Sequence, residues 1–102
     1  MIGNGKIVVL MLGGARRVSM GELLIDSGKR LGYDVEILSY ELEECVPIAA
    51  IGRVIIGRKW RDADVVEHLV ETVKRYAVNI ILPFVDGAIA VASECKRLLP
   101  DV

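Results

Sequence analysis

Residues 8–24, which read VVLMLGGARRVSMGELL, decide the fold. The apolar run that starts at residue 7 and ends at residue 12 has no alternating polar positions, which is typical of a central β-strand covered on both faces. Two glycines end the run. Ser19 and Glu22 then form a Ser-x-x-Glu box, the signature of a helix N-terminus. The stretch therefore predicts a buried strand, a glycine turn and a helix.

The rest of the sequence continues this alternation of strands and helices. Short apolar or β-branched runs predict strands, and apolar residues at helical spacing predict helices. The expected strands cover residues 7–12, 35–40, 54–56 and 79–82, and the expected helices cover residues 19–31, 65–77 and 86–99. An apolar, proline-containing loop is expected at 45–52. In the second strand, one face is expected to be less deeply buried.

Three residues are expected to define the helix ends further along the chain. Gly32 follows the first helix, where a residue with positive φ is favoured. Asp62 or Asp64 is expected to cap the second helix, since an acidic first turn suits the helix dipole.

This order of elements predicts the fold class. Strands that alternate with helices imply parallel βαβ units with right-handed crossovers. We therefore expect an α/β fold, namely a three-layer, Rossmann-like, doubly wound and mainly parallel sheet of about four strands with flanking helices. The length of 102 residues, without an internal linker, predicts one domain over residues 1–102.

Composition and charge exclude several classes of function. The net charge of −1 gives no general attraction for nucleic acid or acidic membranes. Two cysteines are too few for a disulfide framework, and with one histidine they predict no metal site. The first apolar run is too short to span a bilayer. We therefore expect a cytoplasmic protein that binds no nucleic acid, membrane or metal.

The turn after the first strand is the main candidate site, because ligands of such sheets bind at the carboxyl ends of the strands. Glycines allow close approach of a ligand, and a helix N-terminus with arginines favours an anion. The turn lacks the third glycine of a dinucleotide fingerprint and is not a phosphate-binding loop. The predicted anion-binding residues are Gly13, Gly14, Ala15, Arg16 and Arg17. The alternative is a glycine turn with two solvated arginines.

Two acidic residues at other strand ends are further candidates. Asp86 follows the fourth strand and is expected to cap the third helix, with a ligand contact beside Arg16 as a second role. Glu41 follows the second strand, where dinucleotide-binding folds keep an acid for the ribose. We favour the interpretation that Glu41 belongs to a solvated acidic loop.

Other chemistry-bearing residues are expected to be structural. His68 lies off the apolar stripe of its helix, which predicts a surface histidine. Trp60 is expected to anchor its loop or to lie in an interface. Cys95 is expected in the core, and Cys45 is expected to be exposed without acting as a nucleophile.

Four stretches of the sequence together resemble a known family. They are the Gly-Gly-x-Arg-Arg turn, LGYDVEILSYE, DADVVEHLVETVKRYAVNIILP and FVDGAIAVASECKRLL. In this order they resemble the N-terminal, pre-ATP-grasp domain of ATP-grasp enzymes, in particular of carbamoyl-phosphate synthase large subunit-like proteins and related carboxylate–amine ligases. The resemblance covers nearly the whole chain and depends on the order and spacing of all four stretches.

The resemblance implies the substrate-side domain of an ATP-dependent ligase that forms carbon–nitrogen bonds. In that family, ATP and Mg²⁺ are held mainly by two following lobes, which this sequence lacks. We therefore expect no cofactor on this chain alone, no activity in isolation, and a piece of a longer ligase or a chain that docks with the lobes in cis or in trans.

The resemblance also assigns residues. Gly13, Gly14, Arg16 and Arg17 match the glycine–arginine turn of the family, and Pro83 and Asp86 match the loop after its fourth strand. Arginines there would suit a small carboxylate or phosphate metabolite.

Two alternatives to the ligase domain stay open from the sequence. One is a free-standing Rossmann-like module that binds a nucleotide or an anionic effector, and the other is a purely structural or dimerising domain. The missing third glycine argues against the first, and the paired arginines argue against the second.

Overall fold

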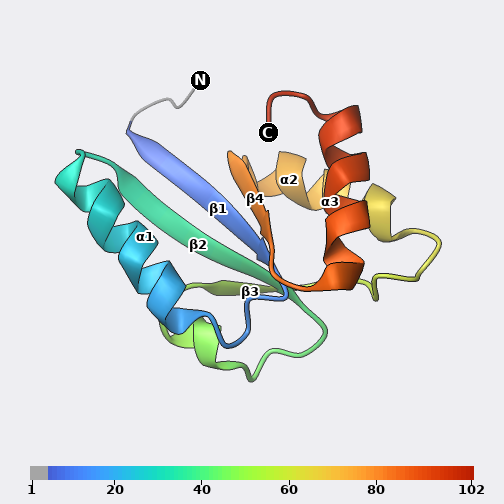
Figure 1. Ribbon diagram of the computed structural model, residues 1–102, viewed down its shortest axis with the longest axis horizontal. Helices are drawn as coiled ribbons and strands as arrows, with labels where there is room; N and C mark the ends of the chain where they lie inside the picture. Colours follow the sequence, from blue (N-terminus) through green and yellow to red (C-terminus); the bar gives the residue numbers. More distant parts are fainter. Residues whose placement is uncertain (1–4) are drawn as a thin grey trace.

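The computed structural model, which describes residues 5–102, has a four-stranded parallel sheet between two layers of helices (Figure 1). The elements in chain order are β1 (Lys6–Leu12), α1 (Val18–Arg30), β2 (Asp34–Glu41), the 3₁₀ helix η1 (Pro47–Ala50), β3 (Arg53–Ile56), α2 (Val65–Tyr76), β4 (Ile80–Pro83) and α3 (Asp86–Leu98). The α/β fold class and the predicted order of strands and α-helices are confirmed. The expected loop at 45–52 contains η1.

The strand order is β3-β2-β1-β4, and every neighbouring pair is parallel. The chain runs outward from β1 to β2 and β3, and α2 then returns it to β4 on the other side of β1. The order therefore reverses between β1 and β4, which is the switch point where ligands of such sheets bind.

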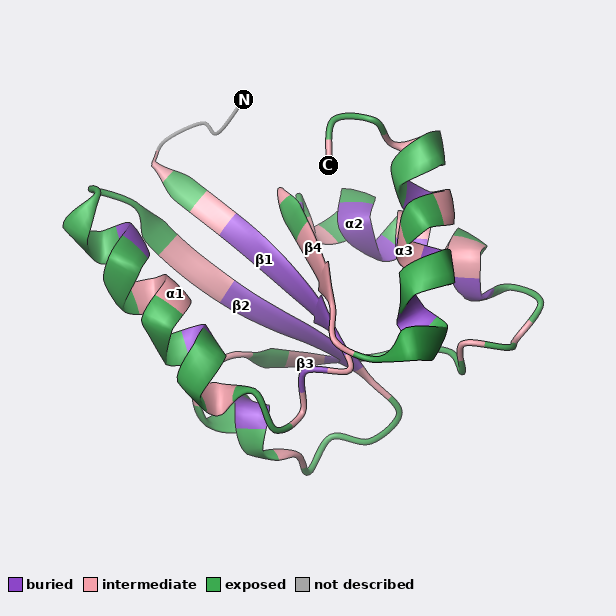
Figure 2. Ribbon diagram, in the orientation of Figure 1, coloured by how far each residue is buried: buried purple, intermediate pink, exposed green. Residues whose placement is uncertain are grey.

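Strand β1 has no polar residue from Ile7 to Leu12, because both of its faces are covered there. Val8, Leu10 and Leu12 pack in one cluster with α2 and α3. Val9 and Met11 point to the other face and pack with η1 and α1. Burial is concentrated in the carboxyl halves of β1 and β2 (Figure 2). The sheet is thus most rigidly packed next to the edge where its strands end.

The expectation of a less buried face on β2 is wrong. Leu38 and Tyr40, which belong to that face, are 0% and 1% exposed. The cause is the crossover of α2, whose Leu69 packs in the same cluster. The alternating pattern within β2 does not show which of its faces a later helix will cover. Leu69 lies about 30 residues further along the chain, a separation typical of a βαβ unit.

The Ser19–Glu22 capping box does not form. Helix α1 begins at Val18, and its N-cap is Arg17, with no side chain capping the helix. The turn is closed by the backbone instead, because the Arg17 N–H donates to the carbonyl of Gly14 at 2.9 Å.

The C-terminal end of α1 follows the prediction. Gly32 has φ +85°. The N–H of Gly32 donates to Lys29 at 3.1 Å, and the N–H of Tyr33 donates to Gly28 at 2.8 Å. This pair of bonds satisfies the last carbonyls of the helix and requires the left-handed residue that glycine supplies.

The acidic residues at the starts of α2 and α3 do not cap with their side chains. Asp64 is the N-cap residue of α2, but its carboxylate accepts a hydrogen bond from Arg58 Nε at 3.1 Å. Asp86 is the first residue of α3, and Val85 is the N-cap, so the predicted Asp86 cap is wrong. The Asp86 charge still lies in the first turn, where the helix dipole favours an acid.

Both cysteines lie where the sequence predicts: Cys95 is buried and Cys45 is exposed, each as a free thiol. Within residues 5–102, none of the helices is both long enough and apolar enough to cross a membrane.

Candidate functional site

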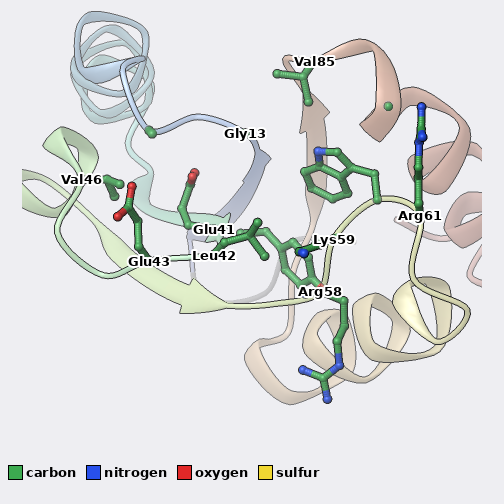
Figure 3. Close-up of a pocket in the computed structure, with 13 residues that line it drawn as sticks. Gly13, Glu41, Leu42, Glu43, Val46, Arg58, Lys59, Arg61 and Val85 are labelled. Carbon is green, nitrogen blue, oxygen red and sulfur yellow. The ribbon is translucent and has the colours of Figure 1, made fainter.

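A pocket of about 800 Å³ opens at the carboxyl edge of the sheet (Figure 3). Four segments line it: the turn after β1, the end of β2 with the loop that follows, the segment between β3 and α2, and the start of α3. Its lining residues are Gly13, Ala15, Tyr40, Glu41, Leu42, Glu43, Val46, Arg58, Lys59, Trp60, Arg61, Val85 and Gly87. This volume is in the range of pockets that hold small molecules.

Two stacked aromatic rings form one wall of the pocket. The ring centroids of Tyr40 and Trp60 are 5.6 Å apart, with 27° between the ring planes. Glycines lie against the two rings. A Cβ added at Gly57 would overlap the Tyr40 ring, and one added at Gly87 would lie 3.1 Å from Trp60 Cδ1. Because Gly57 has no side chain, the segment between β3 and α2 can lie against the Tyr40 ring, and because Gly87 has none, Trp60 can lie against the start of α3.

The Tyr40 hydroxyl connects the pocket wall to α2. It accepts a hydrogen bond from the Arg58 N–H at 3.0 Å, and it lies 2.7 Å from His68 Nδ1. Because the hydroxyl oxygen already accepts from Arg58, its own proton is available to His68. Burial raises the pKa of the Tyr40 hydroxyl, and the Arg58 N–H opposes this shift. The hydroxyl is therefore neutral at ordinary pH and fixes the start of the segment between β3 and α2.

The expectation of a surface histidine at position 68 is wrong. His68 is partly buried, and its ring lies 5.6 Å from the Tyr40 ring, centroid to centroid. The two residues are 28 positions apart in the sequence. Spacing within α2 gives no signal for this contact, which depends on how the crossover places α2 against β2.

Charges of opposite sign lie on different sides of the pocket. Glu41 and Glu43 follow β2, whereas Lys59 and Arg61 belong to the segment between β3 and α2 (Figure 3). None of these four side chains forms an ion pair with another residue of 5–102. Arg58, in contrast, points away from the pocket and pairs with Asp64 at 3.1 Å.

The structure brings only part of the predicted site together. Gly13 and Ala15 line the pocket, and Gly13 has φ +78°. Glu41, the weaker candidate, also lines it. Gly14 is buried, and a Cβ there would lie 2.6 Å from Met11 Cβ. Gly14 thus allows the turn to pack on β1 rather than on a ligand.

The two arginines and Asp86 do not line the pocket. Arg16 and Arg17 are exposed. The Arg17 guanidinium lies 5.2 Å from the centre of the Phe84 ring, so it makes a cation–π contact with the loop after β4. Asp86 is exposed, and its neighbours Val85 and Gly87 line the pocket in its place.

The site predicted from the sequence does not include the segment Arg58-Lys59-Trp60-Arg61. Trp60 is expected to anchor its loop or to lie in an interface, and its stack on Tyr40 fits the anchor, but the prediction does not place the neighbouring cations near a ligand. A signal was available, because three basic residues and the only tryptophan of the chain directly follow the third parallel strand. That strand ends at the same edge of the sheet as the others.

The lining side chains provide charged and aromatic groups for a ligand. They include no cysteine, serine, threonine or histidine, and the one hydroxyl present, on Tyr40, is already bonded to Arg58 and lies beside His68. The described part of the chain contains no group of three or more His, Cys, Asp or Glu side chains able to hold a metal ion. The pocket therefore offers carboxylates, cations and an aromatic wall.

No protein-family model matches this chain, and no curated protein matches its sequence.

Proposed function

We propose that the chain is the substrate-side domain of an ATP-grasp-type carboxylate–amine ligase, and that its carboxyl-edge pocket holds a small carboxylate or phosphate ligand. The observation that supports the ligand site is the pocket itself, in which Lys59 and Arg61 form no ion pair with another residue of 5–102 and lie beside an aromatic wall. The ligase assignment rests on the sequence resemblance. ATP and Mg²⁺ would be bound by the lobes, in cis or in trans, in a cytoplasmic enzyme.

Apolar side chains that line the pocket are exposed, as expected if another domain packs over them. Leu42 is 59% exposed and Val85 is 39% exposed, and both belong to the pocket lining. Large apolar side chains that stay exposed around a binding pocket are typical of surfaces covered by another domain. In this proposal the ATP-binding lobes cover this side of the pocket.

The proposal moves the anion site away from the turn at Arg16 and Arg17. Guanidinium and ammonium groups form charge-assisted hydrogen bonds with carboxylates and phosphates, and each such bond is worth about 1.5–3 kcal/mol. Lys59 and Arg61 can reach a ligand held in the pocket. Arg17 is engaged with Phe84, and Arg16 lies outside the lining.

Ligand titrations of the purified chain test this assignment. Carboxylates, amino acids and inorganic phosphate are titrated while the fluorescence of Trp60, the only tryptophan, is recorded. We expect Lys59→Ala and Arg61→Ala each to weaken binding about tenfold, since one charged hydrogen bond is lost. The matched control is Arg16→Ala, an exposed arginine at the same edge, which should bind like the parent chain.

The opposite pattern would contradict the assignment. If Arg16→Ala or Arg17→Ala abolished binding while Lys59→Ala and Arg61→Ala did not, the anion site would lie at the glycine–arginine turn instead of the pocket. If no carboxylate or phosphate bound at millimolar concentration, the substrate-side role would fail.

A nucleotide-binding module is the second candidate, because Glu41 lines the pocket at the end of β2. An acid at this place in a doubly wound sheet binds the ribose of a dinucleotide. A nucleotide at a hundred times its Kd would stabilise the fold by about 2.7 kcal/mol. A clear thermal shift with NAD(P) or ATP, and none with carboxylates, would favour this module over the ligase domain.

A further inference from the structure

The carboxyl-edge pocket is charged on two sides, and the signs are opposite. Figure 3 shows Glu41 and Glu43 on the β2 side and Lys59 and Arg61 on the side of the segment that follows β3. Trp60 lies between Lys59 and Arg61 in the sequence, lines the same pocket and stacks on Tyr40. A ligand that fills the pocket therefore meets both signs of charge and an apolar surface.

A purely anionic ligand would match only half of this pocket. It would pair with Lys59 and Arg61 but would lie in the same space as two carboxylates that have no cation of their own within residues 5–102. Like charges held close together in a partly desolvated site are unfavourable. A cation would face the same difficulty on the basic side.

The Glu41 carboxylate on the acidic side of the pocket is oriented by a neighbouring residue of β2. Ser39, which is 0% exposed, donates its hydroxyl to Glu41 Oε2 at 2.5 Å. This hydrogen bond orients the carboxylate and leaves Oε1 without a partner in the described chain. An orientated carboxylate with one free oxygen is a suitable acceptor for an ammonium group.

The space between the charged sides suits an apolar body. Leu42, Val46, Val85 and Trp60 contribute apolar surface to the lining. Aliphatic and aromatic side chains around a few separated polar groups are the usual composition of a selective small-molecule site.

We propose that the pocket binds a zwitterion of the amino-acid or short-peptide class. The ammonium group pairs with Glu41 and Glu43, the carboxylate pairs with Lys59 and Arg61, and an apolar side chain packs against Trp60. This inference rests on the proposed ligand pocket and adds the class of ligand that its two charged sides select.

Calorimetric titrations with paired ligands test the inference. L-leucine and leucyl-leucine carry both charges, their N-acetyl derivatives lack the ammonium, and their amides lack the carboxylate. We expect at least one of the two zwitterions to bind about tenfold more tightly than both of its derivatives, because each derivative loses one charged partner. The free amino acid and the dipeptide distinguish a short ligand from one that spans the pocket.

Variants assign each charge to its partner. Glu41→Gln should weaken binding of the zwitterion about tenfold and should not weaken binding of the anionic N-acetyl derivative, which is relieved of a like charge. Lys59→Met should weaken binding of the zwitterion and should not weaken binding of the cationic amide, which is relieved of a like charge. The matched control is Glu44→Gln, because Glu44 is exposed on the same loop and does not line the pocket.

Two outcomes would overturn the inference, and they differ in what else they overturn. If the N-acetyl derivatives bind as tightly as the zwitterions, the pocket does not select a zwitterion, but the proposal that it binds an anion still holds. If Trp60 fluorescence and calorimetry detect neither the zwitterions nor the carboxylates and phosphate, both proposals fail.

Discussion

Replacing Gly57 with alanine is expected to destabilise the fold by about 3 kcal/mol, the upper end of the usual cost of overpacking a core. An alanine Cβ at this position would overlap Cζ, Cε1 and Cε2 of the Tyr40 ring. The ring cannot move aside easily, because Tyr40 is 1% exposed and stacks on Trp60. The backbone cannot retreat easily either, since the Gly57 N–H donates to the carbonyl of Glu41 at 2.8 Å.

Urea unfolding followed by circular dichroism measures this change. Gly87→Ala is the matched control, because its added Cβ would lie 3.1 Å from Trp60, a partly exposed side chain that can shift. We expect a cost below about 1 kcal/mol there, since surface substitutions are usually small in effect. If Gly57→Ala unfolds at the same urea concentration as the parent chain, the segment after β3 does not pack on the Tyr40 ring.

The fold is easier to predict from the sequence than the site, because the fold depends on local patterns and the site depends on contacts such as that between Gly57 and Tyr40. Strand β1 has apolar residues at every position from Ile7 to Leu12, and this local pattern predicts burial on both faces wherever the helices lie. Gly32 predicts a helix end because the left-handed conformation is required within two residues of the last turn. Signals of this kind are complete within a short stretch of sequence.

The site depends on contacts between distant stretches. Tyr40, Trp60 and His68 meet because α2 crosses back over β2, and no spacing within β2 or α2 encodes this meeting. The two arginines of the glycine turn illustrate the same limit. Their position predicts an anion site, but the structure provides Arg17 with an aromatic partner, Phe84, from the neighbouring loop after β4.

The Ser19 and Asp86 caps failed for a different reason. A side chain caps a helix only when the chain enters the helix with the right backbone geometry. The turn after β1 starts α1 at Val18, two residues too early for Ser19 to be the N-cap. The loop after β4 starts α3 at Asp86 itself, so the side chain that was expected to cap lies within the first turn.

Replacing Tyr40 with phenylalanine is expected to cost about 2 kcal/mol and to loosen the aromatic wall of the pocket. The change keeps the ring and its stack on Trp60 but removes the hydroxyl that meets Arg58 N–H and His68 Nδ1. Each polar group left without a partner in a buried place costs about 1–3 kcal/mol. Urea unfolding gives the free energy, and acrylamide quenching of Trp60 fluorescence reports how far the wall has loosened.

Substitutions at His68 distinguish the effect of its hydrogen bond with Tyr40 from the effect of its packing. His68→Ala should lower stability and increase quenching of Trp60, because the hydroxyl loses its partner on α2. His68→Asn should recover most of both, since an asparagine carbonyl oxygen can accept a hydrogen bond near the position of Nδ1. If His68→Asn behaves like His68→Ala, the contact between Tyr40 and His68 does not hold the wall.

The stability of the parent chain should also depend on alkaline pH in a way that Tyr40→Phe removes. Burial raises the pKa of the Tyr40 hydroxyl above its ordinary value of 10.0. The unfolded chain then releases this proton at a lower pH than the folded chain. The contribution of the hydroxyl is therefore complete below about pH 10 and is lost as the pH rises toward the folded pKa. We expect the difference in unfolding free energy between the two chains to shrink as the pH rises above about 10, and a constant difference would contradict the buried, neutral hydroxyl on which the pocket wall depends.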